Sequence, residues 1–173
     1  MQHLAELKLL VQKHKWRINN LRTNLAHSPD DVITQGTLRR LRKGVYSNSV
    51  REGDSVQGDR MLEIVREMLP HANINALQLN RDVVCGRHKD GKNSAAESYI
   101  LFFGEYNGGA LVFENGERFE EKEVWHGPMR SRDLAHWNER ILPVSNGKFR
   151  KYAVVAYYNE GKRLRLKPHA LDT

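Results

Sequence analysis

The sequence predicts an α+β fold, in which helices brace a sandwich or jelly-roll core of antiparallel strands. Two observations support this class. In the first third of the chain, apolar side chains recur every three to four positions, which is the period of a helix. From residue 74 onward, short apolar runs alternate with turns rich in glycine and asparagine, as is typical of strands. A chain of 173 residues is long enough to bury one such core.

The N-terminal segment has the pattern of an amphipathic helix over residues 4–22, with lysine and arginine on the flanks of an apolar stripe. Pro29 and the aspartates that follow it interrupt this pattern. We therefore expect residues 1–30 to form a basic helical appendage and residues 31–173 to form the main domain.

Two further helices are predicted before the strands begin. Residues 37–43 form a short basic pattern that Gly44 ends. The polar run over residues 47–58 predicts a loop. Residues 59–69 then predict a helix whose apolar positions can face a sheet and which Pro70 ends.

The strand region contains five runs with the composition of strands. Turn residues close the second run at Asn107, and Asn115 followed by Gly116 is the strongest hairpin signal in the chain. The predicted strands span residues 76–80, 98–103, 110–113, 132–137 and 151–158.

The charge balance favours a polyanionic partner, and nucleic acid is the first candidate. Lys plus Arg number 28 and Asp plus Glu 21, giving a formal net charge of +7 and a sequence pI near 9.6. No apolar run approaches the ~20 residues of a membrane span, and the N-terminus lacks the apolar core of a signal peptide. Cys85 is the only cysteine. We expect a soluble protein in an intracellular, reducing compartment, without a membrane partner.

A candidate metal site begins at His88 and Asp90, which are two residues apart. At the end of a strand, side chains with this spacing leave the same face. An imidazole and a carboxylate on one face grip a divalent metal from one side. A third ligand from a later strand would complete the two-histidine, one-carboxylate triad typical of non-haem Fe(II) oxygenases.

Three later histidines are candidates for that third ligand. His136 lies in a half-apolar predicted strand, His126 lies in a predicted turn before Gly-Pro, and His169 lies in a basic tail. We favour His136. A tetrahedral zinc site formed by Cys85, His88, His126 and His136 is the alternative, but it leaves Asp90 without a role.

A basic pair near the last predicted strand is a candidate for binding a carboxylate. Arg150 and Lys151 are neighbours, and neighbouring residues on a strand face opposite ways. Only one of them can point into the core. Arginine would bind a carboxylate bidentately, whereas lysine would act as a point charge.

These residues and several other stretches, taken in order, resemble the TET/JBP group of 2-oxoglutarate- and Fe(II)-dependent dioxygenases. The group oxidises the 5-methyl group of pyrimidines in DNA, and the likeness is greatest to its compact single-domain members from microbial eukaryotes, mobile elements and phages. It implies a double-stranded β-helix (jelly-roll or cupin-like) core with helices packed outside. The stretches that carry the resemblance are residues 78–80, 88–93, 97–100, 104–111, 136 and 151–157.

Carried over by position, the resemblance makes His88, Asp90 and His136 the iron ligands. It places Lys151, rather than Arg150, where the family has the arginine that pairs with the distal carboxylate of 2-oxoglutarate. Ala153 stands where a serine commonly adds a hydroxyl contact. Both departures predict weaker or differently arranged co-substrate binding.

Three more positions match residues that contact the target base in this group. Asn93 matches an asparagine that reads the polar edge of the base, and Tyr157 matches an aromatic residue that stacks on it. Asn159 falls where some members carry a base-reading histidine. From the residues alone, core packing is the favoured interpretation for Tyr157, and a turn position beside Gly91 is the favoured interpretation for Asn93.

The resemblance implies an enzyme that uses Fe(II), 2-oxoglutarate and O2, with ascorbate as a possible reductant. Its expected partner is DNA with a flipped 5-methylcytosine or thymine, held by basic residues at 39–43 and 162–167. The implied compartment is the nucleus for a eukaryotic protein and the host cytoplasm for a phage protein. Alternatives are a same-fold dioxygenase acting on N-alkylated bases or RNA, a degenerate nucleic-acid-binding module, and a protein side-chain hydroxylase.

Overall fold

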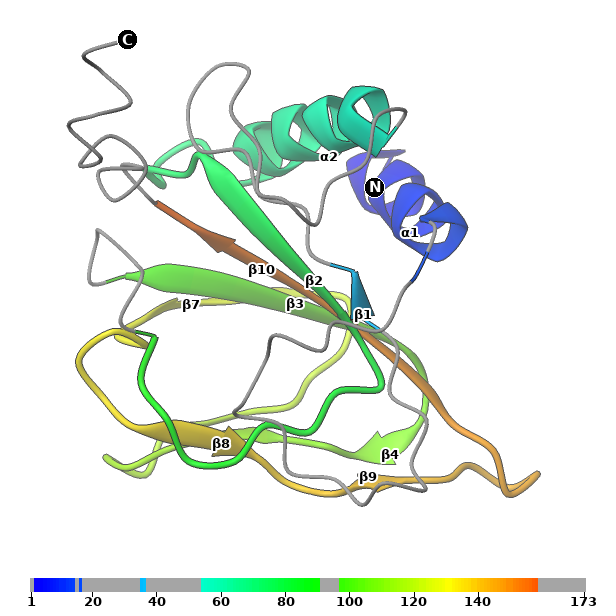
Figure 1. Cartoon of the computed structure of the whole chain (residues 1–173), viewed down its shortest axis with the longest axis vertical. Helices are drawn as coiled ribbons and strands as arrows, with labels where there is room; N and C mark the ends of the chain where they lie inside the picture. The colour runs from blue at the N-terminus through cyan, green and yellow to red at the C-terminus, as the bar shows by residue number, and fades with distance from the viewer. Residues whose placement is uncertain (1, 15, 17–34, 37–53, 91–96, 159–173) are drawn as a thin grey trace, which may run out of the picture.

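The structure is a computed structural model that describes residues 2–14, 16, 35–36, 54–90 and 97–158. Two helices, α1 (Gln2–Lys13) and α2 (Asp54–Met68), pack against each other and cover one face of a sheet (Figure 1). The predicted helix over 37–43 lies outside the described residues. No helix in the described ranges is long and apolar enough to cross a membrane.

The major sheet has five antiparallel strands in the order β1-β2-β10-β3-β7. Its centre is β10, which pairs with β2 on one side and with β3 on the other, so strands far apart in the sequence become neighbours. The bounds are β1 (Gln35–Gly36), β2 (Ala76–Arg81), β3 (Ser98–Glu105), β7 (Trp125–Met129) and β10 (Arg150–Tyr157).

The second layer consists of short strands on the side of the major sheet away from the helices (Figure 1). A three-stranded sheet has the order β6-β5-β8, and β4 pairs separately with β9. Together the two layers form the predicted α+β fold with a jelly-roll, cupin-like core. The bounds are β4 (Asn107–Gly108), β5 (Leu111–Phe113), β6 (Arg118–Phe119), β8 (His136–Asn138) and β9 (Ile141–Leu142).

The major sheet separates two hydrophobic clusters, because successive side chains on a strand point to opposite faces. On the helix side, Leu79 and Val154 are fully buried among side chains of α1 and α2. On the barrel side, Phe102 and Ala153 pack with residues of the short strands, such as Phe113. Fully burying a leucine or phenylalanine stabilises the fold by roughly 1.5–3 kcal/mol, so both faces contribute to stability.

Two of the three predicted helices, those over residues 4–22 and 59–69, need corrected ends. The first helix ends at Lys13, not at residue 22: Trp16 is not helical, and its indole N–H donates to the Val11 carbonyl at 3.2 Å while its ring packs on Tyr152. Residues 17–22 lie outside the described part of the chain. The second helix begins at Asp54, inside the predicted loop over 47–58. Acidic and hydroxyl residues favour a first helical turn, but in sequence they resemble a loop.

The strand predictions are confirmed for β2, β3, β5, β10 and the Asn115-Gly116 hairpin, but two segments are wrong. The predicted strand over 132–137 begins only at His136, because Asp133 and Leu134 donate their N–H groups to the Arg130 carbonyl and form a turn. His126, predicted in a turn, lies in β7. That strand tolerates its proline because it is at the edge of the sheet.

Candidate metal centre

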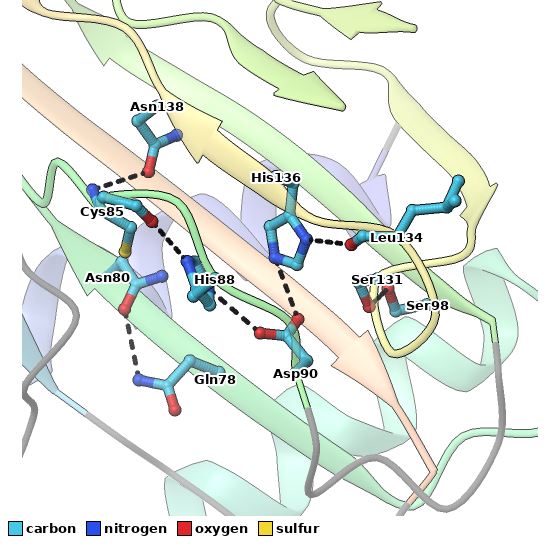
Figure 2. A network of polar contacts seen from close by, with 11 residues as sticks. Gln78, Asn80, Cys85, His88, Asp90, Ser98, Ser131, Leu134, His136 and Asn138 are labelled. Carbon is cyan, nitrogen blue, oxygen red and sulfur yellow. Dashed lines mark hydrogen bonds and ion pairs between the residues drawn. The ribbon is translucent and has the colours of Figure 1, made fainter. Parts of the chain in front are cut away.

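Three side chains converge at one end of the barrel (Figure 2): His88, Asp90 and His136. Their candidate ligand atoms all lie within 4.8 Å of one another, and this is the group of potential metal ligands found among the described residues. Nε2 of His88 is 3.2 Å from one Asp90 carboxylate oxygen, and Nε2 of His136 is 3.4 Å from the other.

Main-chain pairing brings these residues together. His136 is the first residue of β8, and His88 and Asp90 belong to the segment that follows β2. The N–H groups of His88 and His136 each donate to the other's carbonyl, at 3.0 and 2.9 Å. The Asp90 N–H donates to the Ser131 carbonyl at 2.9 Å, and the buried Ser131 hydroxyl is 2.7 Å from that of Ser98 on β3.

The far ring nitrogens of both histidines are fixed by carbonyls. Nδ1 of His88 is 2.6 Å from the Gly86 carbonyl, and Nδ1 of His136 is 2.9 Å from the Leu134 carbonyl. A carbonyl only accepts hydrogen bonds, so each Nδ1 carries a proton and each Nε2 is the ring nitrogen that faces Asp90. Metal-binding histidines are held in the same way.

The donor set fits a divalent cation. With both Nδ1 atoms protonated, neutral rings would turn Nε2 lone pairs toward the Asp90 carboxylate, so positive charge, from protons or from a cation, has to lie between them. Burial by itself raises the pKa of Asp90, but the hydrogen bonds and positive charge that His136 and His88 supply in their protonated forms outweigh it and hold that pKa well below its usual range. The site therefore keeps its carboxylate ionised, as a metal ligand must be.

Lys151 points into the barrel, and Arg150 points outward. The Lys151 ammonium donates to the Gly109 carbonyl at 2.6 Å and lies 4.9 Å from the centre of the Phe102 ring. Burial lowers the pKa of Lys151 to about 8, with partial compensation from Cys85 and Asp82. Arg150 is instead 3.4 Å from the carboxylate of Asp82.

Gly109 makes room for this ammonium. Its φ of +70° is one that L side chains rarely adopt, and a Cβ there would lie 3.1 Å from the Lys151 Nζ. The glycine supplies a carbonyl to the lysine and leaves space for it at the same position.

The other predicted site residues have different outcomes. Ala153 and Tyr157 share the barrel-facing side of β10 with Lys151, since the pairing of β10 with β2 is regular. Asn93, Asn159 and His169 lie outside the described residues, as do the basic stretches at 39–43 and 162–167. Cys85 and His126 do not belong to the cluster of candidate ligands, so the four-ligand zinc alternative has no support in the described residues.

Asn138 is a site residue that sequence reasoning missed. It lies two positions after His136 on β8, and its side-chain oxygen accepts the N–H of Cys85 at 3.0 Å. The i, i+2 spacing from a candidate ligand was the only signal available. Gln78 and Asn80 on β2 also lie beside the cluster (Figure 2), with a hydrogen bond of 3.2 Å between their side chains.

The fold and the site define a jelly-roll protein with a candidate two-histidine, one-carboxylate metal centre. The sequence matches no family model and no curated protein. Among solved structures, the chain is similar to a prolyl hydroxylase from Trichoplax adhaerens in complex with a hypoxia inducible factor oxygen degradation domain peptide fragment. The alignment covers 96% of this chain and 83% of that chain, at 13% identity and a TM-score of 0.48. At this level of likeness, the neighbour's substrate and chemistry do not transfer to this chain.

Proposed function

We propose that the chain is an Fe(II)- and 2-oxoglutarate-dependent dioxygenase that hydroxylates the 5-methyl group of a pyrimidine, 5-methylcytosine or thymine, in DNA. One observation carries the metal and co-substrate part of the proposal. The His88, Asp90 and His136 side chains meet at one end of a barrel that also encloses the ammonium of Lys151.

In this proposal, the three clustered side chains hold Fe(II) from one side and leave positions open for 2-oxoglutarate and O2. Lys151 pairs with the distal carboxylate of 2-oxoglutarate, because it is a buried cation whose ammonium donates to the Gly109 carbonyl and, among the described residues, forms no direct ion pair with a carboxylate. When bound, Fe(II) and 2-oxoglutarate supply the activation of O2 and the hydroxylation of a C–H bond. The chain's own groups bind, orient and exclude water.

The nucleic-acid part of the proposal rests on the sequence. Its support is the resemblance to the TET/JBP group and the net charge of +7. A base inside a duplex has to leave the stack to reach a site within a barrel. Tyr157 on the barrel-facing side of β10 is our candidate for stacking on that base, and Asn93 and Asn159 are our candidates for reading its edge.

The decisive experiment is incubation of the purified protein with DNA containing 5-methylcytosine or thymine, together with Fe(II), 2-oxoglutarate and ascorbate. Nucleosides are then analysed by mass spectrometry and succinate is measured in parallel. We expect hydroxymethylated pyrimidine and succinate from the wild type and neither from Asp90→Ala. Absence of both products with every DNA and RNA substrate would remove the proposal.

Parallel substrates separate the runner-up activities. Product from RNA or from N-alkylated bases, with none from 5-methylpyrimidine DNA, would assign the same chemistry to a different substrate. Succinate without any modified nucleoside would keep the metal and co-substrate assignment and redirect the search to protein side chains.

A binding module without turnover is the second candidate function. The observation that favours it is the pair Lys151 and Ala153, where the resemblance leads one to expect arginine and serine. This alternative predicts that DNA binding is unchanged by His88→Ala and that no iron is recovered with the purified protein. Recovery of iron that His88→Ala abolishes would exclude it.

A further inference from the structure

The segment that carries His88 and Asp90 runs beside β8 but pairs with it irregularly. In a regular antiparallel ladder, the exchange of hydrogen bonds between His88 and His136 is followed by a second exchange two residues along each strand, between residues 86 and 138. Instead, the Asn138 N–H donates to the Cys85 carbonyl at 3.0 Å. One strand therefore contains an extra residue, which is a β-bulge.

The side chain of Asn138 completes this bulge. The Cys85 N–H donates to Oδ1 of Asn138 at 3.0 Å, a hydrogen bond that a main-chain carbonyl accepts in a regular ladder. Asn138 thus holds Cys85 twice, once through its main-chain N–H and once through its side-chain oxygen (Figure 2). Cys85 is buried, so its N–H depends on this partner rather than on water.

The bulge has a chemical consequence at the next residue. In the regular ladder, the Gly86 carbonyl would accept a main-chain N–H from β8, but here that N–H goes to Cys85. The Gly86 carbonyl instead lies 2.6 Å from Nδ1 of His88. This contact places a proton on Nδ1 and turns Nε2 toward Asp90, 3.2 Å from its carboxylate.

We propose that Asn138 is a positioning residue for the metal centre. By accepting the Cys85 N–H, it holds the bulge that frees the Gly86 carbonyl to fix the tautomer of His88. The inference rests on the proposed metal-binding function and deepens it. His136 provides an internal comparison, because the Leu134 carbonyl fixes its Nδ1 without any contribution from Asn138.

The test combines the ring tautomers with metal affinity. Nitrogen NMR of the metal-free protein, at a pH where both rings are neutral, reports which nitrogen of His88 and of His136 carries the proton. A titration with Co(II) chloride, followed by visible absorption, gives the metal affinity. The variants are Asn138→Ala, Asn138→Ser as a second shortened side chain in case the first does not fold, and Asn138→Asp, which retains the accepting oxygen.

A matched control is Asn115→Ala. Oδ1 of Asn115 also accepts a main-chain N–H at 3.0 Å, from Glu117, but in the exposed β5–β6 hairpin. We expect the neutral His88 ring in Asn138→Ala to populate both tautomers, while His136 keeps its proton on Nδ1. Co(II) binding should weaken by about 10–100-fold, as it does when an outer partner of a metal ligand is lost. Asn138→Asp retains the wild-type His88 tautomer, and Asn115→Ala behaves as wild type.

Two results would overturn the positioning role. In one, the shortened variants leave the His88 tautomer and Co(II) affinity as they are in Asn115→Ala. In the other, Asn138→Asp loses the preference for a proton on Nδ1 of His88 as completely as Asn138→Ala does. A wild type that takes up no Co(II), but whose His88 tautomer still depends on Asn138, would remove the proposed function and leave the role of Asn138 in place.

Discussion

The two faces of the major sheet differ in what their strands contribute. Toward the helices, the buried strand side chains are apolar, with Leu79, Phe103 and Val154 as examples. Toward the barrel, the same strands mix apolar side chains with buried polar ones, including Ser98 and Lys151. Because side chains alternate along a strand, one face of the sheet packs against the helices, while the other combines an apolar cluster with the side chains of the proposed site. Substitutions on the two faces should therefore affect different measurements.

The largest expected effect is on the barrel side, at Asp90. Its carboxylate lies between the two Nε2 atoms of the cluster, so Asp90→Ala removes the only anionic member of the candidate ligand set. We expect Co(II) affinity to fall by more than the roughly 100-fold upper limit typical of outer partners of a ligand. The thermal unfolding midpoint of the metal-free protein should fall by no more than the loss of the contacts with His88 and His136 requires, because Asp90 belongs to neither hydrophobic cluster. A large loss of stability with metal binding intact would contradict this division.

The helix-covered face should show the reverse pattern. Leu79 is fully buried in the helix-side cluster, so Leu79→Ala leaves a cavity between the sheet and the helices. We expect the free energy of unfolding to fall by about 2–5 kcal/mol, measured by urea denaturation. The folded fraction should bind Co(II) as the wild type does. A selective loss of metal affinity at unchanged stability would show that the two faces are not independent.

Lys151 sharpens the comparison, because its charge is expected to help binding and to cost stability. A charge-assisted hydrogen bond contributes about 1.5–3 kcal/mol, so Lys151→Met should weaken 2-oxoglutarate binding to the Mn(II)-loaded protein by roughly 10–100-fold. Calorimetry measures this loss. Burying a cation is costly, so the free energy of unfolding at neutral pH should stay the same or rise. Unchanged co-substrate affinity would remove Lys151 from the proposed site.

The smallest expected effect is a dependence of co-substrate binding on pH. Burial lowers the pKa of Lys151 to about 8, so its positive charge is present below that pH and is lost above it. We expect 2-oxoglutarate affinity to be flat below the pKa and to fall by up to about tenfold per pH unit above it. Lys151→Arg should remove this dependence, since arginine stays charged. Calorimetry between about pH 6.5 and 9 compares the wild type with Lys151→Arg. If affinity falls equally in Lys151→Arg, the pH dependence belongs to another group.

Rising pH should change the stability contribution of Lys151 and the affinity for 2-oxoglutarate in opposite directions. The folded-state pKa of Lys151 lies below its ordinary value of 10.5, so the unfolded chain binds more protons between about pH 8 and 10.5. The contribution of Lys151 to stability therefore rises with pH across that window. Co-substrate binding falls across the same window, so the two measurements can be told apart.

Local pattern was enough to predict much of the fold. Apolar alternation identified β2, β3 and β10, and the Asn115-Gly116 pair identified the β5–β6 hairpin. The spacing of His88 and Asp90 likewise placed two candidate ligands on one side of the chain. These features depend on neighbours a few residues apart, and so the sequence by itself determined them.

Tertiary structure decided the features that depend on distant pairing. Main-chain register between the segment after β2 and the start of β8 brings His136, rather than His126, to Asp90. Contact with Gly109 and Asp82 directs Lys151 inward and Arg150 outward, a choice that alternation alone leaves open. The bulge that Asn138 completes depends on one extra residue opposite β8. No periodicity along a single strand records such a register, because hydrogen bonds between separate parts of the chain set it.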